Sequence, residues 1–175
     1  MSLDTNAILE RLKAQAPALR LELQSGAGDL AIKAEPHDLA ELMKLCKSDP
    51  ELKFECLASQ TASHYPKTET TGEHFKLYYH LLSHSLKHQL VVVIEALGSA
   101  PEVDSVVSVW NAANWLERET WDLLGVSFKG HPDLRRIMNP EDWEGHPLRK
   151  DYVIPTQYQD IDNKPSEIAE SFKLS

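Results

Sequence analysis

The stretch that decides the fold is His74–Leu97, which reads HFKLYYHLLSHSLKHQLVVVIEAL. In its first half, large apolar residues alternate with more polar ones, which is the period of a half-buried β-strand. A polar turn at residues 83–87 separates this half from residues 89–97, where both faces are apolar. A strand that is apolar on both faces belongs inside its sheet. The stretch therefore predicts a hairpin whose second strand is central.

Upstream of the hairpin the apolar residues follow two periods, and both are regular enough to predict secondary structure. Spacing of three and four residues predicts helices, and alternation predicts strands. Asp4 can cap the first helix, and the glycine-containing turn at 25–29 can join the first two strands into a small hairpin. The predicted helices cover residues 4–16 and 36–47, and the predicted strands cover residues 19–24, 30–34 and 53–65.

Downstream of the hairpin the sequence predicts one short helix and then a proline-rich segment. Asn114 can cap a helix over residues 115–124, with Glu117 as its capping-box partner, and Gly125 is placed to end it. Five of the ten prolines lie at or after Pro132, so this segment cannot build a core of its own. It also carries large apolar residues. We therefore expect an extended arm that lies on another surface, most simply that of another protein.

The composition is that of an ordinary globular chain with an acidic balance. The 175 residues include 18 Lys and Arg against 27 Asp and Glu, which gives a formal net charge of −9. A general binder of nucleic acid or of acidic membranes needs a basic face, so this balance argues against both. No apolar run reaches the roughly 20 residues that a membrane span needs, and we expect no signal peptide.

Cysteines and histidines are the side chains that could hold a metal ion. Cys46 and Cys56 are ten residues apart and cannot alone ligate zinc or an iron–sulfur cluster, so we expect two free thiols. His80, His84 and His88 are four residues apart, as in a helical metal site, but the alternation around them predicts strand and turn. We therefore expect solvated surface histidines. The sequence has no glycine-rich nucleotide-binding motif and no Gly-x-Ser-x-Gly element.

The stretch from Glu117 to Tyr152 is dense in charged and aromatic residues. Arg118 and Asp122 are one helical turn apart and can form an ion pair. The three consecutive charges at 117–119 cannot share one helix face, so at least one needs a partner off the helix, and arginines of the arm are candidates. Two interpretations stay open: a salt-bridged surface helix with a stiff tail, or a segment that docks on a partner. A general-acid role for a glutamate would need a pocket and a base that the sequence does not show.

This stretch resembles the signature of the 30 kDa subunit family of respiratory complex I, the subunit lettered C in NADH–quinone oxidoreductase. The pattern is Glu-Arg-Glu, an acid three residues later, two apolar residues, a basic residue and a basic–apolar close. A second block, Gly145–Tyr152, also looks like the family, and only about the first 35 residues carry no resemblance. The residues that the resemblance assigns to docking of the arm are Glu117, Arg118, Glu119, Asp122, His131, Arg135, Arg136, His146 and Arg149.

The resemblance implies an α+β fold: a mixed β-sheet with helices packed on one side, followed by an extended proline-rich C-terminal arm. It implies an α+β core domain over residues 1–128 and an arm over residues 129–175 that docks on a partner subunit. It also implies a core subunit of the peripheral arm of the complex, with no catalytic residue, cofactor or metal of its own. Its neighbours would be the quinone-site subunit, lettered D, and the small cluster-bearing subunit, lettered B.

The same resemblance implies where the chain works. The complex passes electrons from NADH to quinone and translocates protons, and its FMN and iron–sulfur clusters belong to partner subunits. The chain is then a peripheral membrane protein on the cytoplasmic side of the bacterial inner membrane, attached only through the complex, and the isolated chain is expected to be inactive.

Other interpretations share parts of this pattern. An equivalent subunit of a related membrane-bound hydrogenase-type or photosynthetic-type complex would carry a similar signature. A metal-dependent enzyme that uses the histidines, or an interaction module outside any redox complex, would not need one. Two features depart from the family: Ser63-His64 stand where many members have an acidic residue, and 175 residues is short for a member.

Overall fold

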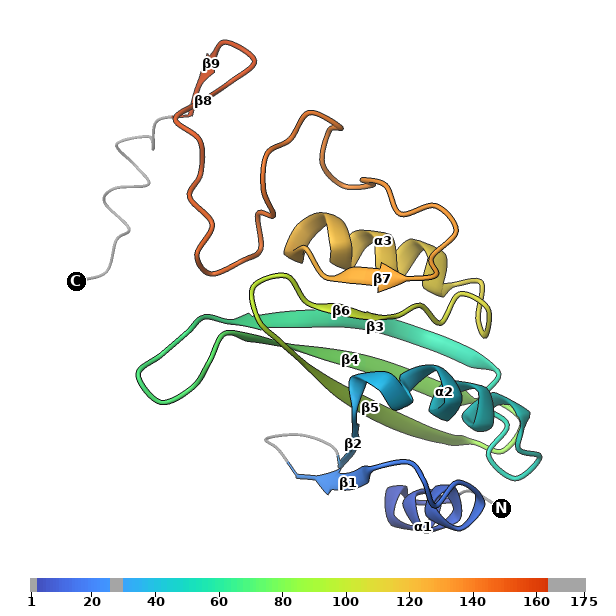
Figure 1. Cartoon of the computed structure of the whole chain (residues 1–175). Helices are drawn as coiled ribbons and strands as arrows, with labels where there is room; N and C mark the ends of the chain where they lie inside the picture. Colours follow the sequence, from blue (N-terminus) through green and yellow to red (C-terminus); the bar gives the residue numbers. More distant parts are fainter. Residues whose placement is uncertain (1–2, 26–29, 164–175) are drawn as a thin grey trace.

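The computed structural model describes residues 3–25 and 30–163 of the chain. Within these ranges the chain forms a mixed sheet of five strands in the order β1-β2-β5-β4-β3 (Figure 1). The predicted hairpin is confirmed as β4 and β5, in an unbroken antiparallel register that begins with His74 opposite Leu97. β5 lies in the middle of the sheet, parallel to β2. The strands are β1 (Leu21–Gln24), β2 (Ala31–Ala34), β3 (Cys56–Tyr65), β4 (His74–Ser83) and β5 (His88–Leu97).

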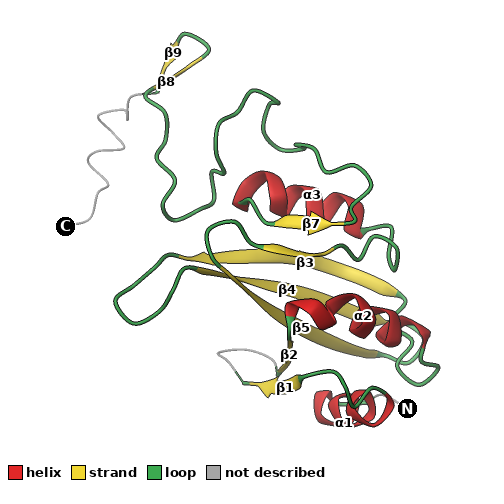
Figure 2. Cartoon of the chain, viewed as in Figure 1, coloured by secondary structure: helices red, strands yellow, loops and turns green. Residues whose placement is uncertain are grey.

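The helices pack on one side of this sheet, as the family resemblance implies (Figure 2). They are α1 (Thr5–Gln15), the 3-10 turn η1 (Pro36–Asp38), α2 (Leu39–Ser48) and α3 (Ala113–Leu124). Asp4 caps α1 as predicted, because its carboxylate accepts the backbone N–H of Ala7 at 2.8 Å. The inner face of β4 carries Phe75 and Tyr79, both fully buried, and forms one apolar core with the inner faces of the helices.

Two further pairs of strands lie outside the main sheet. β6 (Glu102–Asp104) pairs in parallel with β7 (Ser127–Lys129). This pairing joins the segment before α3 to the segment after it. β8 (Gln157–Tyr158) and β9 (Ile161–Asp162) form a small hairpin near the end of the described chain. Among the helices of the described ranges, none is long and apolar enough to cross a membrane.

The strand predicted at residues 53–65 begins later than expected. β3 starts at Cys56, because Lys53 has φ +42° and therefore cannot continue an extended strand. The predicted small hairpin is confirmed, since β1 pairs with β2 in antiparallel fashion. Its glycine-containing turn falls on residues 26–29, which lie outside the described ranges.

The histidines of the hairpin do not all face solvent. His80 and His84 are exposed, as expected. The expectation is wrong for His88, which is 5% exposed and whose Nε2 bonds the carbonyl of Leu52 at 2.6 Å. The alternation of β5 explains the difference, because His88 shares the inner face with the buried Leu90.

Candidate functional site

Helix α3 carries the first half of the charged stretch and packs on the edge strand β3. A buried hydrogen bond from the Thr120 hydroxyl to the Gln60 side chain, at 2.9 Å, joins the two elements. Gly125 ends the helix as predicted, with φ +77°. The predicted capping box is wrong, because α3 begins at Ala113 and Asn114 already lies inside its first turn without capping it.

Glu117 points into the loop that precedes α3. Its fully buried carboxylate accepts hydrogen bonds from the Ser105 hydroxyl at 2.6 Å and from the Val106 N–H at 2.7 Å. It therefore does not bond the backbone N–H groups at the start of α3. Burial raises the pKa of Glu117 from the ordinary 4.5 to about 7, against these two hydrogen bonds, which favour the charged form. Glu117 therefore fixes α3 to its loop with a group that changes charge near neutral pH.

Asp122 is the centre of the contact between α3 and the arm. Its carboxylate is fully buried, and Oδ1 lies 2.6 Å from Nη1 of Arg136. Oδ2 accepts hydrogen bonds from the backbone N–H groups of residues 137–139, which directly follow Arg136, at 2.7 to 2.9 Å. The Asn139 side chain donates to Oδ1 at 2.8 Å. One carboxylate on the helix therefore sets the path of residues 136–139.

The surroundings of Asp122 keep it charged. Burial by itself would raise the pKa of this carboxyl, but hydrogen bonds from Asn139, Ile137 and Arg136 outweigh burial and hold the pKa well below its usual range. A buried carboxylate with both oxygens saturated by donors is a strong attachment point for a segment without a core of its own.

Arg118 does not pair with Asp122, although the two are one helical turn apart. Its guanidinium donates to the carbonyls of Arg135 at 3.2 Å and Arg136 at 3.3 Å, and it lies 5.3 Å from the centre of the Trp115 ring. Asp122 is already saturated by the arm, which explains why the predicted pair does not form. The charges at 117 and 118 do have partners off the helix, but these are not the candidate arginine side chains: Glu117 bonds Ser105 and Val106, and Arg118 donates to backbone carbonyls of the arm.

His131 ties the start of the arm to the start of α3. Its Nε2 donates to the carbonyl of Asn114 at 3.1 Å, and its Nδ1 accepts the N–H of Asp133 at 3.0 Å. Arg135 is exposed and pairs with Asp133 at 2.9 Å. Glu119 is also exposed, and it makes no hydrogen bond or ion pair to the residues that the structure describes. These last two side chains therefore lie at the surface, Arg135 in a local ion pair.

His146 packs against the end of α3. Its Nδ1 donates to the carbonyl of Asp122 at 2.9 Å, and its ring lies edge-on to Trp121 with ring centres 6.4 Å apart. A Cβ on Gly125 would lie 2.6 Å from Cδ2 of His146. Two features therefore require glycine at position 125: the left-handed backbone conformation and the close approach of the arm.

We predict that Gly125→Ala lowers the free energy of unfolding by about 2 to 4 kcal/mol, because it adds backbone strain and displaces His146. Urea unfolding followed by circular dichroism measures the loss. Gly130→Ala is the matched control: Gly130 has φ +82°, but a Cβ there meets nothing within 4 Å. The control should lose only the backbone part, about 1 kcal/mol. Equal losses in the two variants would show that the contact with His146 does not matter.

A second group of contacts, which sequence analysis found only in part, fixes the arm to the end of the sheet. His64 is buried; its Nδ1 accepts the backbone N–H of Lys150 at 2.9 Å, and its Nε2 donates to Glu73 at 3.1 Å. Arg149 lies 3.7 Å from the same oxygen of Glu73 and donates to the carbonyl of Ser99. We call these four residues, His64, Glu73, Arg149 and Lys150, the clip. Arg149 is among the residues that the family resemblance assigns to docking, and His64 is a departure from the family pattern.

A possible set of metal ligands combines two residues of the clip with the neighbouring Asp151. Donor atoms of His64, Glu73 and Asp151 lie within 4.8 Å of one another. However, the guanidinium of Arg149 already supplies positive charge beside Glu73, and the Lys150 N–H already occupies Nδ1 of His64. We therefore interpret the group as an attachment of the arm.

Part of the arm lies on its own domain, where the expectation was the surface of another protein. This part, residues 130–152, passes over α3 and the end of the sheet (Figure 1). Saturated polar groups hold this part in place, which an analysis of apolar residues does not detect. Several large apolar side chains still point away from the domain. They are Met138, Leu148, Val153, Ile154 and Ile161.

The nine predicted residues thus divide by location. Those that meet around the end of α3, which we call the Asp122 hub, are Arg118, Asp122, Arg136 and His146. Those placed elsewhere are Glu117 in the preceding loop, Arg149 in the clip, His131 at the start of the arm, and the exposed Glu119 and Arg135. The chemistry of the hub is that of holding a polypeptide segment, since each of its charges is directed at the arm or at the helix.

Comparisons with known proteins agree with one another. A family model described as the 30 kDa subunit of respiratory-chain NADH dehydrogenase matches residues 32–158. The NADH-quinone oxidoreductase subunit lettered C of Roseiflexus castenholzii is 38% identical over 154 residues, which cover 88% of this chain and 87% of that protein. The subunit of the same name from Acidothermus cellulolyticus is 40% identical over 135 residues, which cover 75% and 69% of the two chains.

Two solved structures share the fold. A trypsin-resistant fragment, residues 1–134, of the protein Nqo5 superposes with a TM-score of 0.58 at 28% identity, covering 74% of this chain and 98% of the fragment. A chain of the membrane-bound sulfane sulfur reductase, an archaeal respiratory membrane complex, superposes with a TM-score of 0.68 and covers 85% of each chain. At 21% identity this second likeness shows the fold alone.

Proposed function

The chain belongs to the 30 kDa subunit family of respiratory-chain NADH dehydrogenase, and we propose that it serves as this subunit in the peripheral arm of a proton-translocating NADH–quinone oxidoreductase. In this role it scaffolds the quinone-site subunit, lettered D, and lies next to the cluster-bearing subunit, lettered B. Electrons pass from NADH to quinone through other subunits. The chain is held at the cytoplasmic side of the inner membrane only through the complex.

The observation that carries the docking role is the apolar surface of the arm. Val153 is 84% exposed and Ile154 is 65% exposed. They follow shortly after Arg149 and Lys150, which the clip holds against the sheet. Large apolar side chains on a segment that is fixed upstream by specific contacts are typical of a surface that a partner covers. This supports an arm, residues 129–175, that docks on a partner subunit.

The two cysteines support a subunit that leaves redox chemistry to its partners. Cys46 is fully buried, and burial raises the pKa of its thiol to about 12. A thiol in that state is a poor metal ligand, because metals bind the thiolate. Cys56 is ten residues away and half-buried. In the proposal, the iron–sulfur clusters therefore belong to other subunits, and so does the FMN, whose placement follows from the family and not from the cysteines.

The double variant Val153→Ser, Ile154→Ser tests this proposal. Both side chains are exposed, so the fold should be unchanged, while burial of each against a partner should be lost. We expect affinity purification of the variant from its own membranes to recover at least about tenfold less NADH–quinone reductase activity than the unmodified chain. Mass spectrometry of the co-purified proteins identifies the subunits that are lost.

Leu97→Ser is the matched control, because Leu97 is 75% exposed but lies at the end of β5 and not on the arm. Its recovery should equal that of the unmodified chain. Full recovery with the double variant would contradict docking through the arm. Co-purification of hydrogenase-like subunits in place of NADH-oxidising ones would assign the chain to a related membrane-bound complex.

A further inference from the structure

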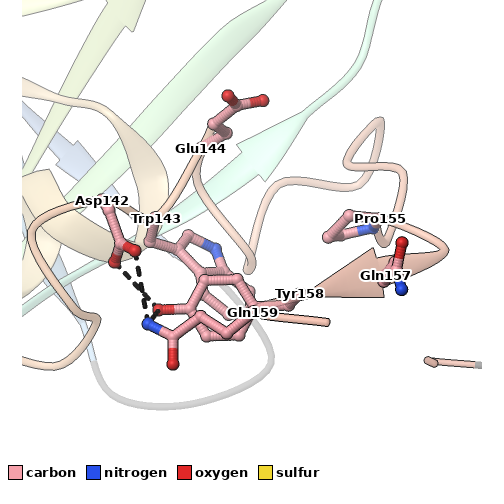
Figure 3. A pocket seen from close by; sticks show the side chains of 7 residues that line it. All are labelled: Asp142, Trp143, Glu144, Pro155, Gln157, Tyr158 and Gln159. Carbon is pink, nitrogen blue, oxygen red and sulfur yellow. Dashed lines mark hydrogen bonds between the residues drawn. The ribbon is translucent and has the colours of Figure 1, made fainter. Parts of the chain in front are cut away.

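Residues 142–159 of the arm line a hollow of about 380 Å³ that the docking contacts above do not use (Figure 3). Its walls are the rings of Trp143 and Tyr158, whose centres are 4.9 Å apart and tilted by 55°, together with Pro155. Two acidic side chains, Asp142 and Glu144, also line it. It therefore combines aromatic faces with negative charge at one place on an exposed segment.

The hollow is held in shape by its own residues. Asp142 accepts the Tyr158 hydroxyl at 2.9 Å and the side-chain amide of Gln159 at 3.3 Å, and these contacts fix the β8–β9 hairpin beside Trp143 (Figure 3). The turn of this hairpin places Gln159 at φ +46° and Asp160 at φ +61°, a conformation that favours glycine.

The hollow is also connected to the Asp122 hub. Nη2 of Arg136 donates to the carbonyl of Trp143 at 2.7 Å and to that of Gly145 at 3.1 Å, while its Nη1 pairs with Asp122. One guanidinium therefore sets both the position of the arm on α3 and the position of one wall of the hollow.

The segment that forms the hollow is rich in acidic residues. Between residues 141 and 162 the basic residues of the Lys and Arg type are Arg149 and Lys150. Arg149 already lies beside Glu73 in the clip. The acidic side chains of this segment are Glu141, Asp142, Glu144, Asp151, Asp160 and Asp162. The hydrogen bonds from Tyr158 and Gln159 lower the pKa of Asp142, so its carboxylate is charged at neutral pH.

We propose that this hollow receives a basic side chain, arginine or lysine, from a neighbouring subunit. The cation would lie against the rings of Trp143 and Tyr158 and pair with the carboxylates of Asp142 and Glu144, which together match a guanidinium or ammonium group. This inference rests on the proposed function, because it assumes that the arm docks on a partner. It adds the chemistry of the contact, which is electrostatic at the hollow and apolar at Val153 and Ile154.

The full chain, labelled with ¹⁵N, tests the hollow without any partner. N-acetyl-arginine methylamide is titrated while the indole N–H resonance of Trp143 is followed, assigned by its loss in Trp143→Phe. We expect a saturable shift in the millimolar range, and none with the neutral N-acetyl-norleucine methylamide. An equal shift with both probes, or none with either, would overturn the proposal.

A pair of double variants separates a specific contact from general attraction. Asp142→Asn with Glu144→Gln removes two charges from the hollow, while the amide oxygen introduced by Asp142→Asn can still accept the Tyr158 hydroxyl. Glu141→Gln with Asp160→Asn removes two charges from the same segment outside the hollow. We expect the first pair to weaken binding of the arginine probe at least about fivefold and the second to leave it nearly unchanged. Equal weakening would leave only general attraction and overturn the proposal.

The same variants in the complex distinguish this inference from the proposed function. The hollow variant should dissociate from its partners at about half the salt concentration needed for the control variant, because the control variant keeps an ion pair that salt must first screen. Dissociation of both variants at the same salt concentration would overturn the hollow while leaving the apolar docking of the arm intact. Failure of the Val153 and Ile154 test would instead overturn the proposed function, whatever the probe does.

Discussion

Replacing Asp122 with alanine is expected to lower the free energy of unfolding by about 3 to 5 kcal/mol, the range for breaking a buried ion pair by removing one partner. The change leaves the Arg136 guanidinium and the backbone N–H groups of residues 137–139 without their acceptor. The arm should also detach from α3. Urea unfolding measures the first effect, and limited trypsin digestion at Arg135 and Arg136 measures the second.

Two controls make this result specific. Asp122→Asn keeps one acceptor oxygen and the shape of the side chain but not the charge, so its loss should be smaller, about 1 to 3 kcal/mol. Glu119→Ala removes an exposed acid from the same helix and should change neither unfolding nor digestion. If Asp122→Ala unfolded and was cleaved like the unmodified chain, the hub would not be what holds the arm.

The second large effect concerns pH and Glu117. Its pKa rises from 4.5 to about 7 on folding, so the folded chain holds this proton more tightly than the unfolded chain does. The stabilising contribution is therefore fully present below pH 4.5 and is lost as the pH rises through 7, up to a total of about 3 kcal/mol. Glu117→Gln mimics the protonated form and should keep this stability at every pH.

The measurement is the difference in free energy of unfolding between Glu117→Gln and the unmodified chain at about pH 4 and about pH 8. We expect a difference near zero at the lower pH and an advantage for the variant of about 2 to 3 kcal/mol at the higher pH. Glu119→Gln, which alters an exposed residue of the same helix, should show no change in this difference with pH. A constant difference for Glu117→Gln would mean that Glu117 titrates alike in the folded and unfolded chain.

The elements predicted correctly are those whose sequence signal is local. The β4–β5 hairpin follows from alternation over His74–Leu97, and the end of α3 follows from one glycine at the position where the backbone turns left-handed. Both signals arise within a few residues of the structure they specify. Local physics also explains the cap of α1 by Asp4.

The features predicted wrongly depend on partners that are distant in sequence. Glu117 was predicted to bond the start of its own helix in a capping box, but it bonds Ser105 and Val106. Arg118 was predicted to pair with Asp122, but it bonds the arm. Helical spacing shows which side chains of one helix can meet. It does not show which hydrogen-bond acceptors another segment of the chain places nearer to them. The burial of His88 depends likewise on the segment that ends at Leu52.

The nine docking residues came from a family resemblance, and the structure explains only part of that set. Arg118, Asp122, Arg136 and His146 form one network. Arg149 belongs to the clip, whose other side chains, His64 and Glu73, lie outside the charged stretch. The two halves of the clip lie 86 residues apart in sequence. No pattern read along one chain connects such positions, because the pairing is created by the fold.

The arm is held mainly through its own backbone, and this has a consequence for how it can change. Helix and sheet residues bind the carbonyls of residues 135 and 136 and the N–H groups of residues 137–139, 148 and 150. Contacts of this kind do not depend on which side chain each arm residue carries. The outward side chains are therefore open to replacement while the path is kept, so the same scaffold could evolve, or be engineered, to fit a differently shaped neighbour.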